Sequence, residues 1–267
     1  MKDRPTSWIW LAVASICTVQ LGQSLSSHAQ DDVADVPSQR RQVGDDANKS
    51  YFLIPPADEK APADGFGLLV ILPVGDGSAE VHPFIKRIRK HAVPADFAVA
   101  QPISVKWAED QVVVWPTEKL SVEQQEFSTE TLVEEVIKDA ATVHKIDPAR
   151  VYCLGWSSSG PAVYALARKE KSPVKGSYIA MSVYKPKLLP PLKNAKGRSI
   201  YIEHSPDDRV CPYWMARKGH ADLKDAGARV TLATYEGGHG WRGDIYGRIK
   251  TALAWLEEGV SDEGNSP

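Results

Sequence analysis

The chain has 267 residues, of which 43% are hydrophobic, and its 34 acidic and 32 basic side chains leave a formal net charge of −2. This size suits one globular domain with a substantial core, and the near-neutral charge predicts no basic patch of the kind that binds nucleic acid. The 3 cysteines and 7 histidines show no metal-ligand spacing, so we expect neither a metal nor another cofactor.

The first 29 residues predict a secretory signal peptide. Lys2 and Arg4 precede an apolar run over 8–19, and Ser27-His28-Ala29 resembles a small-x-small cleavage site. An uncleaved anchor is the alternative, but the run is shorter than the roughly 20 residues of a membrane span. We therefore expect cleavage after Ala29, export to the periplasm or the medium, and no stable membrane insertion of the mature chain.

Residues 30–49 are polar and without periodicity, which predicts a flexible leader. From 50 to 260, strand-like and helix-like segments alternate, and this favours an α/β fold with a mostly parallel sheet covered by helices on both faces. Short connections leave no room for a sizeable cap domain, and 261–267 form a tail. The expected strands are 51–54, 67–72, 97–101, 151–154, 177–181, 199–203 and 229–235. The expected helices are 83–91, 129–144, 161–169, 213–226 and 246–258.

The segment VYCLGWSSSG, which ends at Gly160, has the layout of a nucleophile elbow. In such an elbow a strand turns sharply into a helix and lifts a serine hydroxyl clear of the backbone. The turn needs small residues two positions before and two positions after the nucleophile. With Ser157 as the nucleophile, these are Gly155 and Ser159, the second being serine where glycine is commoner. The next serine is less suitable, since it puts a tryptophan where a small residue is needed.

Two later strand-like segments end in candidate partners for this serine. RSIYIE (198–203) is followed by HSPDDRVCP (204–212), and ARVTLATYE (228–236) is followed by GGHGW (237–241). Loops at the carboxyl ends of parallel strands meet at one edge of a sheet, so these groups are expected to come together. The chain order Ser, Asp, His is that of the α/β hydrolases and differs from chymotrypsin and subtilisin.

On these segments, together with GLLVILPVGDGSAE (67–80), the chain resembles the α/β-hydrolase superfamily. The similarity is to its small esterases of the phospholipase/carboxylesterase and polyester-depolymerase type, and it runs from about Ser50 to about Gly259. The resemblance implies the α/β-hydrolase fold and a serine-hydrolase site. The chain departs from the family at Pro73-Val74, where many relatives carry histidine and then glycine in the loop that supplies the oxyanion hole.

The resemblance and the loop positions predict a role for each candidate. Ser157 attacks the acyl carbonyl, and His239 is the base that later protonates the leaving alcohol. The acid that orients the imidazole is Asp208, with Asp207 as the alternative. His204 also follows a strand, and its place in the family pattern is structural.

An oxyanion hole requires two backbone N–H donors. One is expected from Ser158, the residue after the nucleophile, and the other from Val74 or Gly75 in the loop after the 67–72 strand. Pro73 has no N–H to donate.

Four tryptophans are candidates for substrate contact, with ordinary packing as an equal alternative for each. They are Trp107, Trp115, Trp156 and Trp241. Of the two cysteines that survive cleavage, Cys153 is expected to act as a small apolar residue of a buried strand, and a disulfide with Cys211 is the alternative.

The sequence therefore predicts an exported serine hydrolase that cleaves a small-molecule or polymer-borne carboxylic ester through an acyl-enzyme. A serine peptidase of the oligopeptidase kind and a thioesterase share the same residues and order. A non-catalytic binding protein that retains the hydrolase scaffold is the alternative outside enzymes, because function belongs to sites and not to folds.

Overall fold

The computed structural model describes residues 31–263. The predicted signal peptide and its cleavage site lie outside this range, as do residues 264–267 of the predicted tail. Within the range, none of the helices combines the length and the apolar character that crossing a membrane requires.

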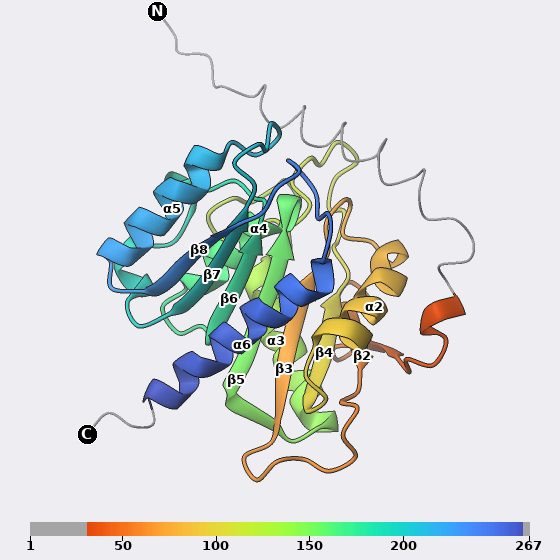
Figure 1. The fold of residues 1–267 in the computed structure, drawn as a ribbon. Coiled ribbons are helices and arrows are strands. Elements are labelled where there is room, and N and C mark those ends of the chain that lie inside the picture. The colour runs from red at the N-terminus through yellow and green to blue at the C-terminus, as the bar shows by residue number, and fades with distance from the viewer. Residues whose placement is uncertain (1–30, 264–267) are drawn as a thin grey trace, which may run out of the picture.

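The described residues form one eight-stranded sheet with strand order β1-β2-β4-β3-β5-β6-β7-β8 (Figure 1). β2 pairs antiparallel with β1 and with β4, and every other neighbouring pair is parallel. The strands are β1 (Gln39–Gln42), β2 (Ser50–Ile54), β3 (Phe66–Leu72), β4 (Phe97–Pro102), β5 (Ile146–Trp156), β6 (Gly176–Ala180), β7 (Ser199–His204) and β8 (Arg229–Thr234).

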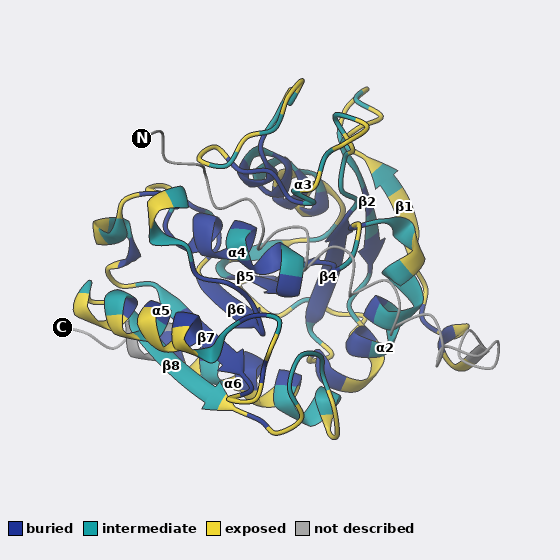
Figure 2. Ribbon diagram, turned by 90° about the horizontal axis from the view of Figure 1, so that it is seen from above, coloured by how far each residue is buried: buried dark blue, intermediate teal, exposed yellow. Residues whose placement is uncertain are grey.

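Helices cover both faces of this sheet. The helices α2 (His82–Ala92) and α6 (Ile245–Glu263) pack on one face and lie in front of the strands in Figure 1. The other face is covered by α3 (Thr129–Val143), α4 (Gly160–Ala167) and α5 (Tyr213–Asp225). Figure 2 shows buried strands between these layers. The prediction of a mostly parallel sheet with helices on both faces and no cap domain is confirmed.

Alternation along the central strands fills both cores. In β3, Leu68 and Val70 pack toward α3 and α4, whereas Leu69 and Ile71 pack toward α2 and α6. All seven residues of β3 are buried, as expected for a strand with neighbours on both edges and helices on both faces. The parallel strands end at a common edge, at the top of Figure 1, where the loops that carry the candidate site residues begin.

Each predicted strand and helix is present, with bounds within five residues of those expected. The prediction of a flexible leader over 30–49 is wrong, because residues 39–42 form β1, which pairs with β2. Arg41 of β1 donates from Nε to Asp139 of α3 at 2.8 Å, which ties this edge to the helix layer. The sheet therefore starts ahead of residue 50.

The structure also tests the alternative prediction of a disulfide between Cys153 and Cys211. Both cysteines are buried, and they are not bonded to each other. Cys153 lies in β5 with no exposed surface, and burial raises the pKa of its thiol, so it acts as a small apolar core residue.

Candidate active site

Ser157 lies in the sharp turn between β5 and α4. Its φ of 51° falls in the left-handed region, which is uncommon for a residue with a side chain. Such strained backbone clusters at functional sites, where neighbouring contacts hold it in place. A short 3-10 turn over Ser157–Ser159 then leads into α4 at Gly160.

The residues around the turn explain why the chain can bend there. A Cβ atom at Gly155 would lie 2.6 Å from Val163 Cγ2, so only glycine fits. The Ser159 hydroxyl accepts from Trp156 N at 2.9 Å and donates to Trp156 O at 3.0 Å, closing the turn on itself. Serine in place of the commoner glycine is therefore accommodated, and it satisfies two buried backbone groups.

Ser157, His239 and Asp208 are joined by hydrogen bonds. Ser157 Oγ lies 3.0 Å from His239 Nε2, and His239 Nδ1 lies 2.9 Å from Asp208 Oδ2. A carboxylate only accepts, so Nδ1 carries the proton and Nε2 is left to accept from the serine hydroxyl. The three residues come from loops after β5, β7 and β8, as the sequence predicts.

Asp208 is held on both of its oxygens. Oδ1 accepts from the backbone N–H groups of Val210 and Cys211, each at 2.8 Å, while Oδ2 faces His239 and also His204. Burial by itself raises the pKa of this carboxyl, but the hydrogen bonds from His204, His239 and Cys211 outweigh it and hold the pKa well below its usual range. Asp207 is exposed, so the geometry favours Asp208 over its neighbour.

His204, for which the sequence predicts a structural role, is a fourth residue of this hydrogen-bonded group. Its imidazole is fully buried, and Nε2 lies 2.7 Å from Cys211 O and 3.2 Å from Asp208 Oδ2. Because the Cys211 carbonyl only accepts, Nε2 must carry a proton, and His204 donates toward both groups. The position four residues before Asp208, at the end of a strand, is the sequence signal that could have identified this contact.

Glycines and three anchors shape the loop that carries His239. Gly237, Gly238 and Gly240 all have positive φ, a conformation that other residues adopt only at a cost. Gly238 N donates to Ser205 Oγ at 3.0 Å, and Tyr235 donates from its hydroxyl to Gly238 O at 3.1 Å. A third anchor comes from α6, where Arg248 donates from Nη2 to the Arg242 carbonyl at 2.7 Å.

Solved structures share this architecture. A thermostable esterase superposes with a TM-score of 0.63 at 18% identity, over 86% of this chain and 63% of that one. An α/β hydrolase enzyme from a Medee basin deep-sea metagenome library gives 0.60 at 14%, over 85% and 98%. Thermogutta terrifontis esterase 2, phosphonylated by sarin, gives 0.61 at 17%, over 87% and 96%. The fold is that of the α/β hydrolases. No protein-family model matches the sequence, and no curated protein does either.

In this hydrolase fold, the loop after β3 lies against the elbow. Ser158 donates from Oγ to Gly75 O at 3.4 Å, and Trp115 donates from Nε1 to Pro73 O at 2.9 Å. The backbone of Val74 and Gly75 is thereby held next to the residue after Ser157. Their N–H groups, and that of Ser158, stay predicted oxyanion donors.

The four tryptophans differ in their surroundings. Trp115 and Trp156 are buried, which favours packing over the substrate contact that the sequence analysis proposed as one option. Trp241 packs on Trp156 with ring centroids 4.8 Å apart, and Trp107 packs edge-on against Phe127 at the same distance. The sequence could not separate these cases, because burial depends on contacts between distant loops.

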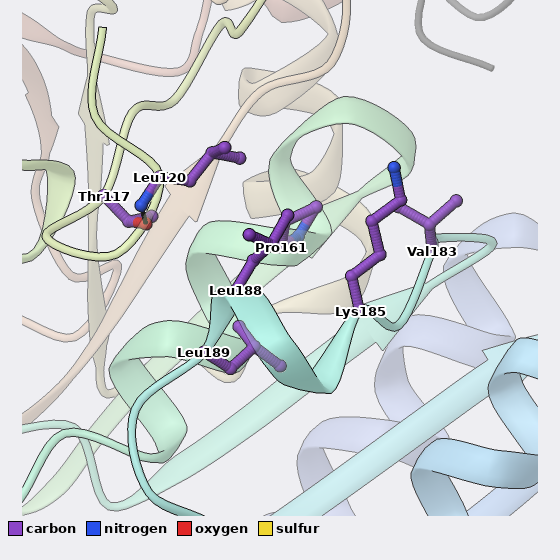
Figure 3. Close-up of a pocket in the computed structure, with 7 residues that line it drawn as sticks. All are labelled: Thr117, Leu120, Pro161, Val183, Lys185, Leu188 and Leu189. Atoms are coloured by element: carbon purple, nitrogen blue, oxygen red, sulfur yellow. Dashed lines mark hydrogen bonds between the residues drawn. The ribbon is translucent and has the colours of Figure 1, made fainter. Parts of the chain in front are cut away.

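A shallow hollow lies next to the elbow, and none of Ser157, Asp208 and His239 lines it (Figure 3). Two of its lining residues, Pro161 and Val183, show this position. The residues directly before them, Gly160 and Ser182, both donate hydrogen bonds to the Ser157 carbonyl. Its lining is mostly apolar and includes none of the four tryptophans. The lining residues are Thr117, Leu120, Pro161, Val183, Lys185, Leu188 and Leu189.

Proposed function

We propose that the protein is an exported serine esterase that hydrolyses carboxylic esters through an acyl-enzyme intermediate. The observation that carries the proposal is the line of hydrogen bonds from Ser157 through His239 to Asp208, at 3.0 Å and 2.9 Å. A serine hydroxyl is a weak nucleophile at neutral pH and needs a base within this distance. A binding protein has no need of such a line.

The roles follow from the hydrogen-bond donors and acceptors. Ser157 Oγ attacks the ester carbonyl while His239 Nε2 takes its proton, and the resulting imidazolium is stabilised by Asp208 through Nδ1. His239 then gives the proton to the leaving alcohol. Water attacks the acyl-enzyme in the same way and releases the acid, with the proton returning to Ser157.

The oxyanion of the tetrahedral intermediate needs N–H donors at the elbow. We assign these to Ser158 and to Val74 or Gly75, because the loop that carries the last two contacts Ser158. Loss of one such donor typically lowers kcat by roughly 100- to 1,000-fold. Pro73 takes no part as a donor, since its nitrogen carries no hydrogen.

The hollow beside the elbow suggests a substrate with a short apolar acyl group. The hollow is shallow, its lining is mostly apolar, and it lies on the side of the elbow where the Ser157 carbonyl is bonded. In a series of p-nitrophenyl esters we expect kcat/KM to be highest for short acyl chains and to fall as the chain outgrows the hollow. A maximum at long chains would contradict this assignment of the acyl group.

Export rests on the N-terminal sequence. We expect the mature protein, when expressed with its own leader in a bacterial host, to be recovered outside the cytoplasm with Gln30 as its first residue. Intact-mass measurement of the recovered protein tests this. A full-length mass in the membrane fraction would support an uncleaved anchor instead.

The decisive experiment requires no known substrate. The mature protein is treated with a fluorophosphonate probe, since one structural neighbour is phosphonylated by sarin, and the adduct is located by peptide mass spectrometry. We expect one adduct on Ser157 in the folded protein, with none after heat denaturation or in Ser157→Ala.

Three outcomes separate the proposal from its alternatives. An adduct together with ester turnover supports the esterase. An adduct with faster turnover of thioesters or peptides would move the assignment to a thioesterase or a peptidase. Absence of any adduct on folded protein would favour a binding protein on the hydrolase scaffold.

A further inference from the structure

A third side chain with metal-binding chemistry lies beside the proposed acid and base. The Cys211 sulfur, a carboxylate oxygen of Asp208 and a ring nitrogen of His239 all lie within 4.8 Å of one another. Thiolate, carboxylate and imidazole are the three ligand types that Zn²⁺ binds in proteins. Across residues 31–263, no other group of three or more such side chains comes this close together.

The spacing of these atoms is near that of a tetrahedral site. Bonds of about 2.3 Å to sulfur and about 2.0 to 2.2 Å to nitrogen and oxygen place neighbouring ligand atoms roughly 3.3 to 3.7 Å apart. Distances of up to 4.8 Å exceed this spacing by about 1 Å, so the three side chains must close in by that amount to reach an ion, and water completes the coordination.

Access is provided by the imidazole side of the cluster. The Asp208 carboxylate and Cys211 are buried, whereas the His239 side chain is 15% exposed and lies on a glycine-rich loop. The sequence gives no sign of the cluster, because Asp208 and Cys211 come from the loop after β7 and His239 from the loop after β8.

We propose that Cys211, Asp208 and His239 form an inhibitory site for Zn²⁺ and other thiophilic divalent ions. The imidazole nitrogen that faces Asp208 is Nδ1, so the ion binds there and the ring proton moves to Nε2. Nε2–H then donates to Ser157 and can no longer accept its proton. The thiol releases its proton to solvent when its sulfur binds the ion.

Metal binding and inhibition are measured separately, since only the inhibition rests on the proposed esterase function. Mature, metal-free protein is titrated with Co²⁺ alone, and a thiolate-to-cobalt charge-transfer absorption is expected, which Zn²⁺ then displaces. Hydrolysis of p-nitrophenyl acetate by the same protein is expected to fall as Zn²⁺ is added.

Two cysteine variants identify the ligand, each compared with its own metal-free activity. In Cys211→Ser the cobalt absorption disappears, and the Zn²⁺ concentration for half-inhibition rises by more than about 100-fold, because losing a ligand costs more than losing a group that orients one. In Cys153→Ala, the matched control, both properties are retained.

Absence of the charge-transfer absorption in the wild-type protein would overturn the proposal, and this measurement does not depend on any variant folding. Equal Zn²⁺ inhibition of the wild type and Cys211→Ser would also overturn it. A cobalt–thiolate absorption in a protein without esterase activity supports the metal site and counts against the proposed function alone.

Discussion

Ser159 bonds both backbone groups of Trp156 and so closes the turn that presents Ser157. In Ser159→Ala a buried N–H loses its acceptor, and we expect the free energy of unfolding to fall by about 1 to 3 kcal/mol. Urea unfolding measures the change, with Ser158→Ala as the neighbouring control. A loss no larger than the control's would show that this hydroxyl does not hold the turn.

Asp208 should make stability depend on pH. Although burial raises its pKa, the hydrogen bonds from His204, His239 and Cys211 hold the pKa below the ordinary value of 3.8. A carboxyl with a lowered pKa in the folded state stabilises the fold above its unfolded pKa, and this contribution is lost as the pH falls through the folded pKa.

The stability advantage of the wild type over Asp208→Asn is therefore expected to be full at about pH 7 and to shrink below about pH 4. Urea unfolding of both proteins across this range provides the measurement. An advantage that stays constant down to about pH 3 would mean that Asp208 has an ordinary pKa in the fold.

The loop between β8 and α6 depends on an arginine of the helix that follows it. Arg248 donates from Nε to Glu203 of β7 at 3.0 Å and from Nη2 to the Arg242 carbonyl at 2.7 Å. Glu203 is buried, and its other oxygen accepts from the Tyr178 hydroxyl. One side chain thus links the sheet, the helix and the loop that carries His239.

Replacing this arginine should affect both stability and turnover. In Arg248→Met a buried carboxylate loses its cation, and we expect a loss of about 3 kcal/mol in unfolding free energy together with a lower kcat. Lys218→Met, at an exposed pair with Asp222 on α5, is the control and should cost less than about 1 kcal/mol. Equal effects in both variants would contradict a special role for Arg248.

The predictions of helices and strands are correct where the apolar periodicity is strong and wrong where it is absent. The central strands and the helices were predicted because their apolar residues recur at the spacing of each element. β1, with the sequence QRRQ, carries no such signal and becomes a strand only by pairing with β2. The contact from Trp115 to Pro73 was unpredictable, because it depends on the path of a long loop.

At the scale of the whole molecule, residues 33–42 contact the helices on both faces of the sheet at one of its edges. Val33 and Val36 are buried in the core shared with α2, and Lys90 of that helix pairs with Asp35 at 2.8 Å. A few residues later, Arg41 bonds to α3 on the opposite face. The predicted cleavage after Ala29 leaves all of these contacts in the mature chain.

A shortened protein tests this arrangement. Compared with a chain that begins at residue 30, one that begins at residue 43 should lose about 3 to 5 kcal/mol of unfolding free energy, since two buried valines and an edge strand are removed. Urea unfolding of both proteins measures the difference. Equal stability would restore the prediction of a flexible leader.

The glycines of the His239 loop have a further consequence. Glycine loses more conformational freedom on folding than any other residue, and this loop carries three positive-φ glycines on three anchoring hydrogen bonds, while the sheet beneath it is closely packed. The loop should consequently open locally before the domain melts. On heating, ester turnover is expected to vanish several degrees below the calorimetric transition and to return fully on cooling from that interval.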